Sequence, residues 1–249
     1  MAMNILITAG GTSEKIDQVR SITNHSTGRL GKNIAEALCK YPSMTIDYVT
    51  TPTAVTPESR ENIHFHFIES TQDLFDTLKH LTTEKNYDGI IHSMAVSDFT
   101  PAFSLSEEQL EKSIMQTPLT ATLLPQWLEQ NSEYPMNDEK ISSDTQHLLI
   151  ALKKTPKIIS FLRKWQPKAK IIGFKLLVDV PKAHLIEVAK KSLQKNQVDY
   201  IFANDLTQIK GERHHGYLLA EDGTIKEAKT KKEIAKLLTS VIIEPSFFD

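Results

Sequence analysis

The run Asn4-Ile5-Leu6-Ile7-Thr8-Ala9-Gly10-Gly11-Thr12 constrains the fold of this chain more than any other stretch. A short apolar run that is stopped by glycines is typical of a strand buried in a parallel sheet. Gly10 and Gly11 permit a tight turn, and they let a ligand approach where a Cβ would clash. We therefore expect a ligand to bind where this first strand ends.

A polar segment downstream, Thr23–Gly31, leads into a helix that we expect from Lys32 to Lys40. Ser26–Gly28 would lie at the start of this helix, where free amides and the helix dipole favour an anion. A dinucleotide fingerprint would hold all its glycines in one tight turn, whereas here the two glycine pairs lie far apart. The glycines alone also fit an ordinary strand-to-helix connection, but the long polar loop favours a binding site.

Composition bounds the class of protein. The 249 residues include 40% hydrophobic residues, which suffices for one α/β domain, with or without an elaboration. A net charge of −2 gives no case for nucleic acid or a membrane surface as the main partner. No stretch is long enough to cross a bilayer, and the single cysteine, Cys39, has no partner for an intramolecular disulfide. We therefore expect a cytoplasmic protein in which Cys39 is buried.

Strands and helices alternate along most of the chain. Their expected ranges are Met44–Thr50, Ile63–Ile68, Asp88–Ala95, Ala169–Leu177 and Asp199–Asp205 for strands, Ser70–Asn86, Ile158–Trp165, Pro181–Asn196 and Thr230–Ile243 for helices, and Tyr217–Ala228 for a hairpin. Such alternation with right-handed crossovers predicts an α/β fold with a doubly wound, mostly parallel, Rossmann-like sheet. We expect one domain over residues 1–249.

One segment, Thr100 to about Gln146, breaks this alternation. It is rich in Ser, Thr, Glu, Gln and Pro, and we expect two short helices in it, Leu105–Met115 and Leu123–Gln130. A long, weakly periodic insert in a compact domain is usually a lid, an arm or disorder. On composition alone, Lys140 near the end of this segment would be a solvated surface lysine, since lysines are mostly exposed.

The polar ends of the expected strands share one edge of the sheet. They are Gly10–Gly11, Ala95–Asp98, Gly173–Phe174 and Asn204–Asp205. Open α/β sheets bind ligands at this edge, so we expect one crevice for a nucleotide. Asp98 is a candidate for ribose, base or metal contact, although it also fits the cap of a turn.

Other clusters have plainer interpretations. The lysines within Lys153–Lys157 precede a helix and oppose its dipole, so they either form a solvated turn or balance a bound polyphosphate. His64 and His66 alternate with phenylalanines, which is typical of the polar face of a strand. His214-His215 have no carboxylate or cysteine at ligand spacing, so we expect surface loop residues there.

Several motifs together resemble the phosphopantothenoylcysteine synthetase family. They are Ile7–Thr12, Asp17–Arg20, Ile22–Gly31, Ala95–Phe99, Lys140–Ser143, Gly173–Lys175 and Ala203–Asp205. The resemblance runs from Met3 to about Ile243, and its Asn-His-Ser-(Ser/Thr)-Gly loop is specific. Many bacterial members carry an N-terminal flavin-dependent decarboxylase. In this sequence Met1 lies directly before the first expected strand, so the chain resembles the stand-alone bacterial form.

The resemblance implies a ligase of coenzyme A biosynthesis. It would join 4′-phosphopantothenate to L-cysteine through an acyl-nucleotide, with Mg²⁺ and with CTP hydrolysed to CMP and pyrophosphate. Gly173-Phe174-Lys175 is shared with eukaryotic members, which favour ATP. We nevertheless expect CTP, because over its whole length the chain is more like the bacterial stand-alone forms. The family is dimeric, which makes the insert a lid or dimer arm, and a separate decarboxylase is a functional partner to expect.

The resemblance also implies site residues. The catalytic residues would be Asn24 and Lys140; the nucleotide would contact Gly10, Gly11, Ser26, Thr27, Gly28, Ala95, Asp98, Lys154 and Phe174; and the substrate would contact Asn24, Arg20 and Asn204. The metal ligands stay open. The alternatives are a nucleotide-binding or dehydrogenase-like module without ligase activity, and a scaffold that only binds phosphopantothenate.

Overall fold

The computed structural model describes residues 2–132, 141 and 144–244. Its described residues form two compact units. The sheet unit comprises residues 2–12, 25–96 and 157–244, and the hairpin unit comprises residues 13–24 and 97–156. The hairpin unit is therefore wider than the expected insert, because it begins at Ser97, ends at Pro156 and includes a second segment, Ser13–Asn24.

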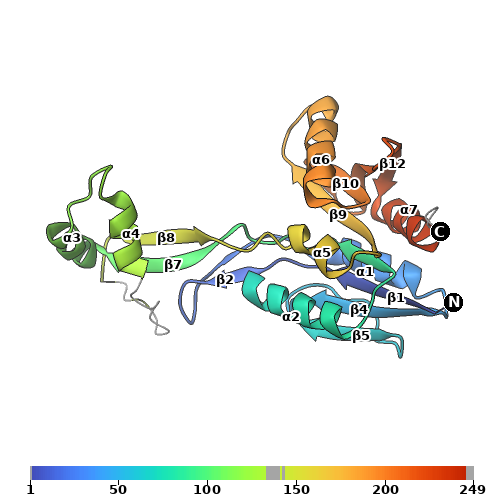
Figure 1. The fold of residues 1–249 in the computed structure, drawn as a ribbon, viewed down its shortest axis with the longest axis horizontal. Coiled ribbons are helices and arrows are strands. Elements are labelled where there is room, and N and C mark those ends of the chain that lie inside the picture. The colour runs from blue at the N-terminus through green and yellow to red at the C-terminus, as the bar shows by residue number, and fades with distance from the viewer. Residues whose placement is uncertain (1, 133–140, 142–143, 245–249) are drawn as a thin grey trace. The chain divides into compact units, whose positions relative to one another are not determined.

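The sheet unit is built on one eight-stranded sheet in the order β12-β11-β10-β9-β6-β1-β4-β5 (Figure 1). The strands are β1 Met3–Thr8, β4 Met44–Thr50, β5 Ile63–Phe67, β6 Gly89–His92, β9 Lys170–Leu177, β10 Tyr200–Lys210, β11 Arg213–Ala220 and β12 Ile225–Thr230. All pairs from β5 to β10 are parallel, and β11 and β12 add antiparallel strands at one edge. The parallel strands follow the Rossmann order, which confirms the expected fold class.

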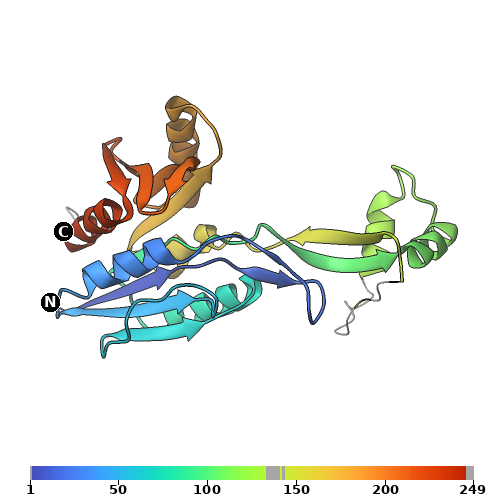
Figure 2. The same cartoon turned by 180° about the vertical axis from the view of Figure 1, so that it is seen from behind.

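Helices cover both faces of this sheet. Helices α1 (Arg29–Leu38) and α7 (Lys231–Ile243) pack on one face, and Figure 2 shows α1 lying along β1. Helices α2 (Thr71–Glu84), α5 (Ile159–Trp165) and α6 (Lys182–Asn196) pack on the other face. The first helix thus starts three residues before the expected Lys32. None of the helices in the described ranges is both long and apolar enough to cross a membrane.

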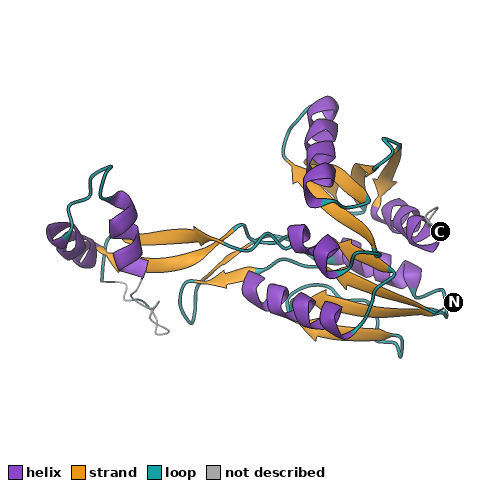
Figure 3. Cartoon of the chain, viewed as in Figure 1, coloured by secondary structure: helices purple, strands orange, loops and turns teal. Residues whose placement is uncertain are grey.

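The hairpin unit has two antiparallel ladders (Figure 3). Its elements are β2 Ser13–Lys15, β3 Ser21–Thr23, β7 Phe99–Ser106, α3 Glu107–Gln116, α4 Leu124–Ser132 and β8 Leu148–Lys154. Phe103, Leu105 and Trp127 form its small core, with the rings of Phe103 and Trp127 5.8 Å apart. The two short helices are confirmed. The ladder of β7 and β8, which pair along most of their length, was not predicted.

The structure tests two predictions about burial, that of Cys39 and that of His214. Cys39 is buried at the end of α1, as expected. His214, by contrast, is not a surface loop residue: it lies in β11 with 7% of its surface exposed. Its ring meets Phe202 edge to face at 6.1 Å, and burial lowers the pKa of His214 to about 4.

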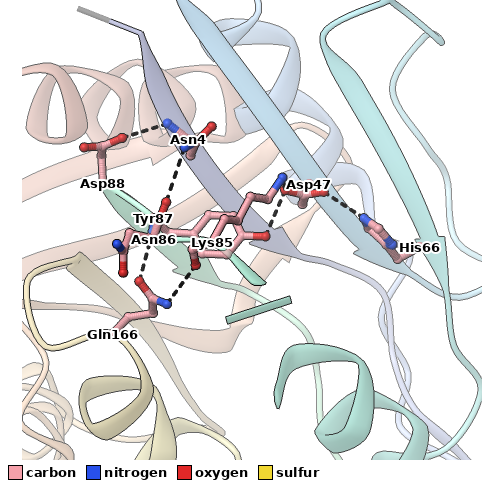
Figure 4. Close-up of polar contacts among 8 residues, drawn as sticks. All are labelled: Asn4, Asp47, His66, Lys85, Asn86, Tyr87, Asp88 and Gln166. Carbon is pink, nitrogen blue, oxygen red and sulfur yellow. Dashed lines mark hydrogen bonds and ion pairs between the residues drawn. The ribbon is translucent and has the colours of Figure 1, made fainter. Parts of the chain in front are cut away.

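A buried carboxylate ties β4, β5 and the end of α2 together (Figure 4). Asp47, in β4, accepts hydrogen bonds from His66 Nε2 at 2.8 Å and Tyr87 Oη at 2.9 Å, and it pairs with Lys85 Nζ at 2.5 Å. Gln166 fixes the same region by accepting from the Tyr87 amide and donating to the Lys85 carbonyl. Burial raises the pKa of Asp47, but the three donors outweigh it and lower that pKa to about 2.

We expect Asp47→Asn to lower the free energy of unfolding at pH 7 by about 2 kcal/mol, the value of a pKa shift of this size. The folded-state pKa is depressed, so this stability is present above pH 4 and is lost as the pH falls towards 2. Urea unfolding at stepped pH should show a flatter pH dependence in the variant. Asp76→Asn, which changes an exposed carboxylate on α2, is the control and should change little. Equal effects of both substitutions would contradict this role for Asp47.

Candidate nucleotide site

The winding of the sheet reverses between β1 and β6, the point at which open α/β sheets bind ligands. Beyond these two strands the pairing continues. The Ala95 amide donates to the Gly10 carbonyl at 2.9 Å, and the Thr12 amide donates to the Ala95 carbonyl at 3.0 Å. The Ala95 backbone is thus already engaged, so its methyl group and the second lone pair of its carbonyl are what it can offer a ligand.

Two of the predicted site glycines, Gly10 and Gly28, permit close packing of the backbone. Gly10 has φ +96°, and a Cβ there would lie 3.0 Å from both Ala54 Cβ and Thr51 Oγ1. Gly28 has φ +73° and meets the same Ala54 methyl. The Val55 amide also donates to the Thr27 carbonyl at 3.0 Å. The loop after β4 therefore rests on both glycines and holds the end of β1 and the start of α1 in place.

Helix α1 starts at this point with Gly28 as its N-cap, which gives no side-chain cap, and its first turn has no acidic residue. The Arg29 amide makes one long bond, of 3.5 Å, to Thr27 Oγ1. Gly31 allows the helix to lie close to β1, because a Cβ there would come within 2.3 Å of Ala9 Cβ. Ser26 and Thr27 before it are exposed. An uncapped helix start beside exposed hydroxyls is suited to bind an anion such as a phosphate.

Sequence reasoning missed a buried pair at the same edge. Thr8 Oγ1, at the end of β1, hydrogen-bonds His92 Nδ1, at the end of β6, at 2.8 Å. Burial, and next the charge of Lys157, lower the pKa of His92 to about 4, so its ring is neutral at pH 7. The bond ties together the two strands that carry the glycines and Ala95. Neither residue stands out in sequence, because one His in an apolar run usually fills a core position.

Phe174 and Asn204 lie on one face of neighbouring strands at the carboxyl edge. Phe174 is half-buried in β9, and its ring centroid is 5.5 Å from that of Phe202 in β10. Asn204 is two residues beyond Phe202, so its side chain points to the same face. Asp205 is next and points to the other face, where it is 3% exposed. Of the two polar residues expected at this strand end, Asn204 therefore lies on the same face as Phe174 and Asp205 lies on the opposite face.

The hairpin unit holds four further predicted residues, Arg20, Asn24, Asp98 and Lys154. Asn24 is half-buried and directly follows β3. Asp98 and Lys154 are exposed at the same end of the β7–β8 ladder, where Phe99 pairs with Lys154 and the Thr155 amide donates to the Asp98 carbonyl at 3.2 Å. A carboxylate directly before β7 and an ammonium group at the last residue of β8 therefore lie at the same end of the ladder.

Arg20 is engaged within the hairpin unit. Its Nε and Nη2 donate to Asp17 Oδ2 at 2.8 and 2.5 Å, and Nη2 also donates to the Ile141 carbonyl at 3.0 Å. The Ile141 amide donates to Asp17 at 3.2 Å. These bonds, with the Val19 and Arg20 amides, hold the pKa of Asp17 far below its usual range. Lys140 itself lies outside the described residues. Among the residues described, no three His, Cys, Asp or Glu side chains gather as a metal site.

Comparison with known proteins assigns the chain to a family. The model of the DNA/pantothenate metabolism flavoprotein C-terminal domain matches residues 1–133 and 131–245. The chain belongs to this family. A solved family structure, the DNA/pantothenate metabolism flavoprotein from Streptococcus pneumoniae, is 43% identical with a TM-score of 0.84, over 97% of this chain and 98% of that one.

Curated relatives of the family act in coenzyme A metabolism by name. The coenzyme A biosynthesis bifunctional protein CoaBC of Methanocaldococcus jannaschii is 30% identical over 96% of this chain and 50% of its own length. Phosphopantothenate–cysteine ligase 1 of Arabidopsis thaliana is 28% identical over 81% of this chain and 69% of its own. The chain spans about half the length of the bifunctional relatives that it matches.

Proposed function

We propose that this chain is a ligase that joins 4′-phosphopantothenate to L-cysteine in coenzyme A biosynthesis. The observation that carries the proposal is the match, over most of the chain, to relatives named for this ligase and for this pathway. The uncapped start of α1 at the switch point of the sheet supports it, because the reaction needs a site for phosphates.

The chemistry requires activation of a carboxylate. The pantothenate carboxylate attacks the α-phosphate of a nucleoside triphosphate, and pyrophosphate leaves with the bonding electron pair. The cysteine amine then attacks the acyl carbon, loses a proton, and displaces the nucleoside monophosphate. Both transition states gather negative charge, so amides and cations supply most of the stabilisation. Mg²⁺ would enter with the nucleotide substrate and offset the negative charge of its phosphates.

The sheet unit would bind phosphates and base. Gly10, Gly11 and Ser26–Gly28 would cradle phosphates, as the open amides of α1 favour. Phe174 and Ala95 would frame the nucleotide from the carboxyl edge, and Asn204 would contact substrate from the Phe174 face. Ala95 would do so through its methyl group, because its backbone groups already pair with Gly10 and Thr12.

Residues of the hairpin unit would supply the two catalytic side chains and further contacts to nucleotide and substrate. Asn24 would hold the acyl-nucleotide through its amide, and Lys140 would neutralise the phosphates during activation. Asp98 would contact the nucleotide, and Lys154 would reach its phosphates from the neighbouring strand. Arg20 would serve substrate binding, with its guanidinium already oriented by Asp17.

We propose that the assembly is a homodimer and that the insert, about residues 100–146, serves as a lid or dimer arm. A separate phosphopantothenoylcysteine decarboxylase would consume the product. Sedimentation of the chain at stepped concentrations tests the dimer.

We propose CTP as the nucleotide. A site that pairs its backbone groups with one base leaves them unpaired with another, at about 1–3 kcal/mol each, so kcat/KM for CTP should exceed that for ATP by ~10-fold or more. The measurement follows pyrophosphate at equal Mg²⁺ with phosphopantothenate and cysteine present. ATP at or above CTP overturns the base assignment only. Pyrophosphate release that does not depend on both nucleotide and phosphopantothenate overturns the ligase and favours a binding module.

A further inference from the structure

Asp205 is a buried carboxylate in the sheet unit that no step of the proposed reaction uses. It lies near the middle of β10 with 3% of its surface exposed. Its Oδ1 accepts from the Thr207 amide at 2.8 Å, from Thr207 Oγ1 at 2.7 Å and from the Asp179 amide at 3.2 Å. Its Oδ2 accepts from the Val180 amide at 2.9 Å. These donors, led by the Thr207 hydroxyl, lower the pKa of Asp205 to about 2, so it is ionised at pH 7.

Two of these donors belong to the turn that joins β9 to α6. Apolar packing holds only alternate residues of that segment, because Leu176 and Val178 are 47% and 60% exposed while Leu177 and Val180 pack against the core. Asp179 has φ 51°, a left-handed conformation that a non-glycine residue keeps only when its surroundings hold it. Asp205, which accepts from the Asp179 amide, supplies that restraint.

The same turn determines where α6 starts. Pro181 is the N-cap of α6 and gives it no side-chain hydrogen bond, so the helix has no cap of its own there. The Val180–Asp205 bond is the contact next to this start. Phe174 lies on the other side of the turn, in the strand that pairs Leu177 with Asp205. One carboxylate therefore fixes both the end of the strand that carries Phe174 and the beginning of the helix that follows it.

We propose that Asp205 is a positioning residue of the nucleotide site, which it serves by holding the β9–α6 turn rather than by touching substrate. The inference rests on the proposed function, because it takes the Phe174 wall to be where the nucleotide lies. Loss of the anchor should let this wall move, which weakens nucleotide binding more than it slows the chemical steps.

The test compares Asp205→Asn with two controls. The asparagine keeps the shape but puts a donating NH2 group where a backbone amide also donates. KM and Kd for the nucleotide should therefore rise ~10-fold, the scale of reordering a few residues. The kcat and the KM for phosphopantothenate should stay within about threefold. Thr207→Val removes one hydrogen bond to Asp205 and leaves both turn bonds, so nucleotide KM should not change. Asp222→Asn removes a carboxylate that accepts an amide hydrogen in the β11–β12 turn, and it should not change either.

The outcomes are distinct. If the unsubstituted chain releases no pyrophosphate, the proposed function fails and this inference fails with it. If that chain is active and Asp205→Asn raises nucleotide KM no more than Thr207→Val does, only the inference fails. Equal loss in kcat and in both KM values would mean general damage and overturns it too. Hydrogen exchange in the unsubstituted chain gives a check without any variant: the Asp179 and Val180 amides should be protected, and fast exchange at both overturns the anchor.

Discussion

Replacement of Asn24 by aspartate should leave pyrophosphate release measurable while amide formation falls by ~10² or more, the scale of losing one oriented hydrogen-bond donor. Asn24 directly follows β3, which is held to β2 by a ladder and by the Ser13 Oγ–Thr23 Oγ1 bond of 2.8 Å. The side chain is therefore delivered from a fixed strand end. Aspartate has the same size but no amide donor, and its negative charge repels an acyl-nucleotide.

The measurement separates the two half-reactions. Pyrophosphate release without cysteine reports activation, and quenched samples report the acyl-nucleotide and the amide product. Asn86→Asp, which introduces the same charge at an exposed asparagine of the sheet unit, is the control and should leave both rates unchanged. If Asn24→Asp lowers both half-reactions equally, Asn24 does not act after activation.

The sheet unit could be predicted from sequence because each of its elements carries its own local signal. Ile5, Leu6 and Ile7 of β1 are all buried, as a continuous apolar run before two glycines predicts. The capping box of Ser70 with Asp73 marks the start of α2 in sequence and forms in the structure. Where propensity, periodicity and caps agree, the fold follows from short windows.

The signals of the hairpin unit were weaker. β7 and β8 are stabilised mainly by each other, although more than forty residues separate them. Alternate residues of β7, namely Pro101, Phe103 and Leu105, are buried, so a period-two pattern was present in the sequence, but the proline and serines within it are typical of a loop. β2 and β3, of three residues each, are too short to give a periodic signal, and Asp17 supports the turn between them by accepting from the Val19 and Arg20 amides.

The candidate site divides in the same way. Gly10 and Gly28 were found because positive φ and close approach demand glycine, and both are present. Asp205 was noted only as a polar strand tip, since its role depends on amides of a turn 25 residues earlier. His214 was misjudged because β10 runs on past Asp205 to Lys210 with a register shift, which pairs Ile209 with His214 inside the sheet.

The last prediction concerns Lys140, for which the hairpin unit offers a physical context. Its neighbour Ile141 has both backbone groups bound, the amide by Asp17 and the carbonyl by Arg20. The chain is thus fixed directly after Lys140, at a place where a bound carboxylate and guanidinium already neutralise each other. We propose that the ammonium group of Lys140 acts on an external anion, the triphosphate.

We expect Lys140→Gln to lower acyl-nucleotide formation by ~10² or more, because one positive charge no longer offsets the charge that develops on the phosphates. The fold should persist, which thermal unfolding will show, since we expect a lysine on a lid to contribute little packing. Lys112→Gln removes an exposed lysine of α3 that pairs with Glu108, and as the matched control it should retain full rate. Single-turnover assays with phosphopantothenate and nucleotide alone measure the step directly. A normal rate in Lys140→Gln would make Lys140 a surface residue and would assign activation to other cations, with Lys154 the first to replace.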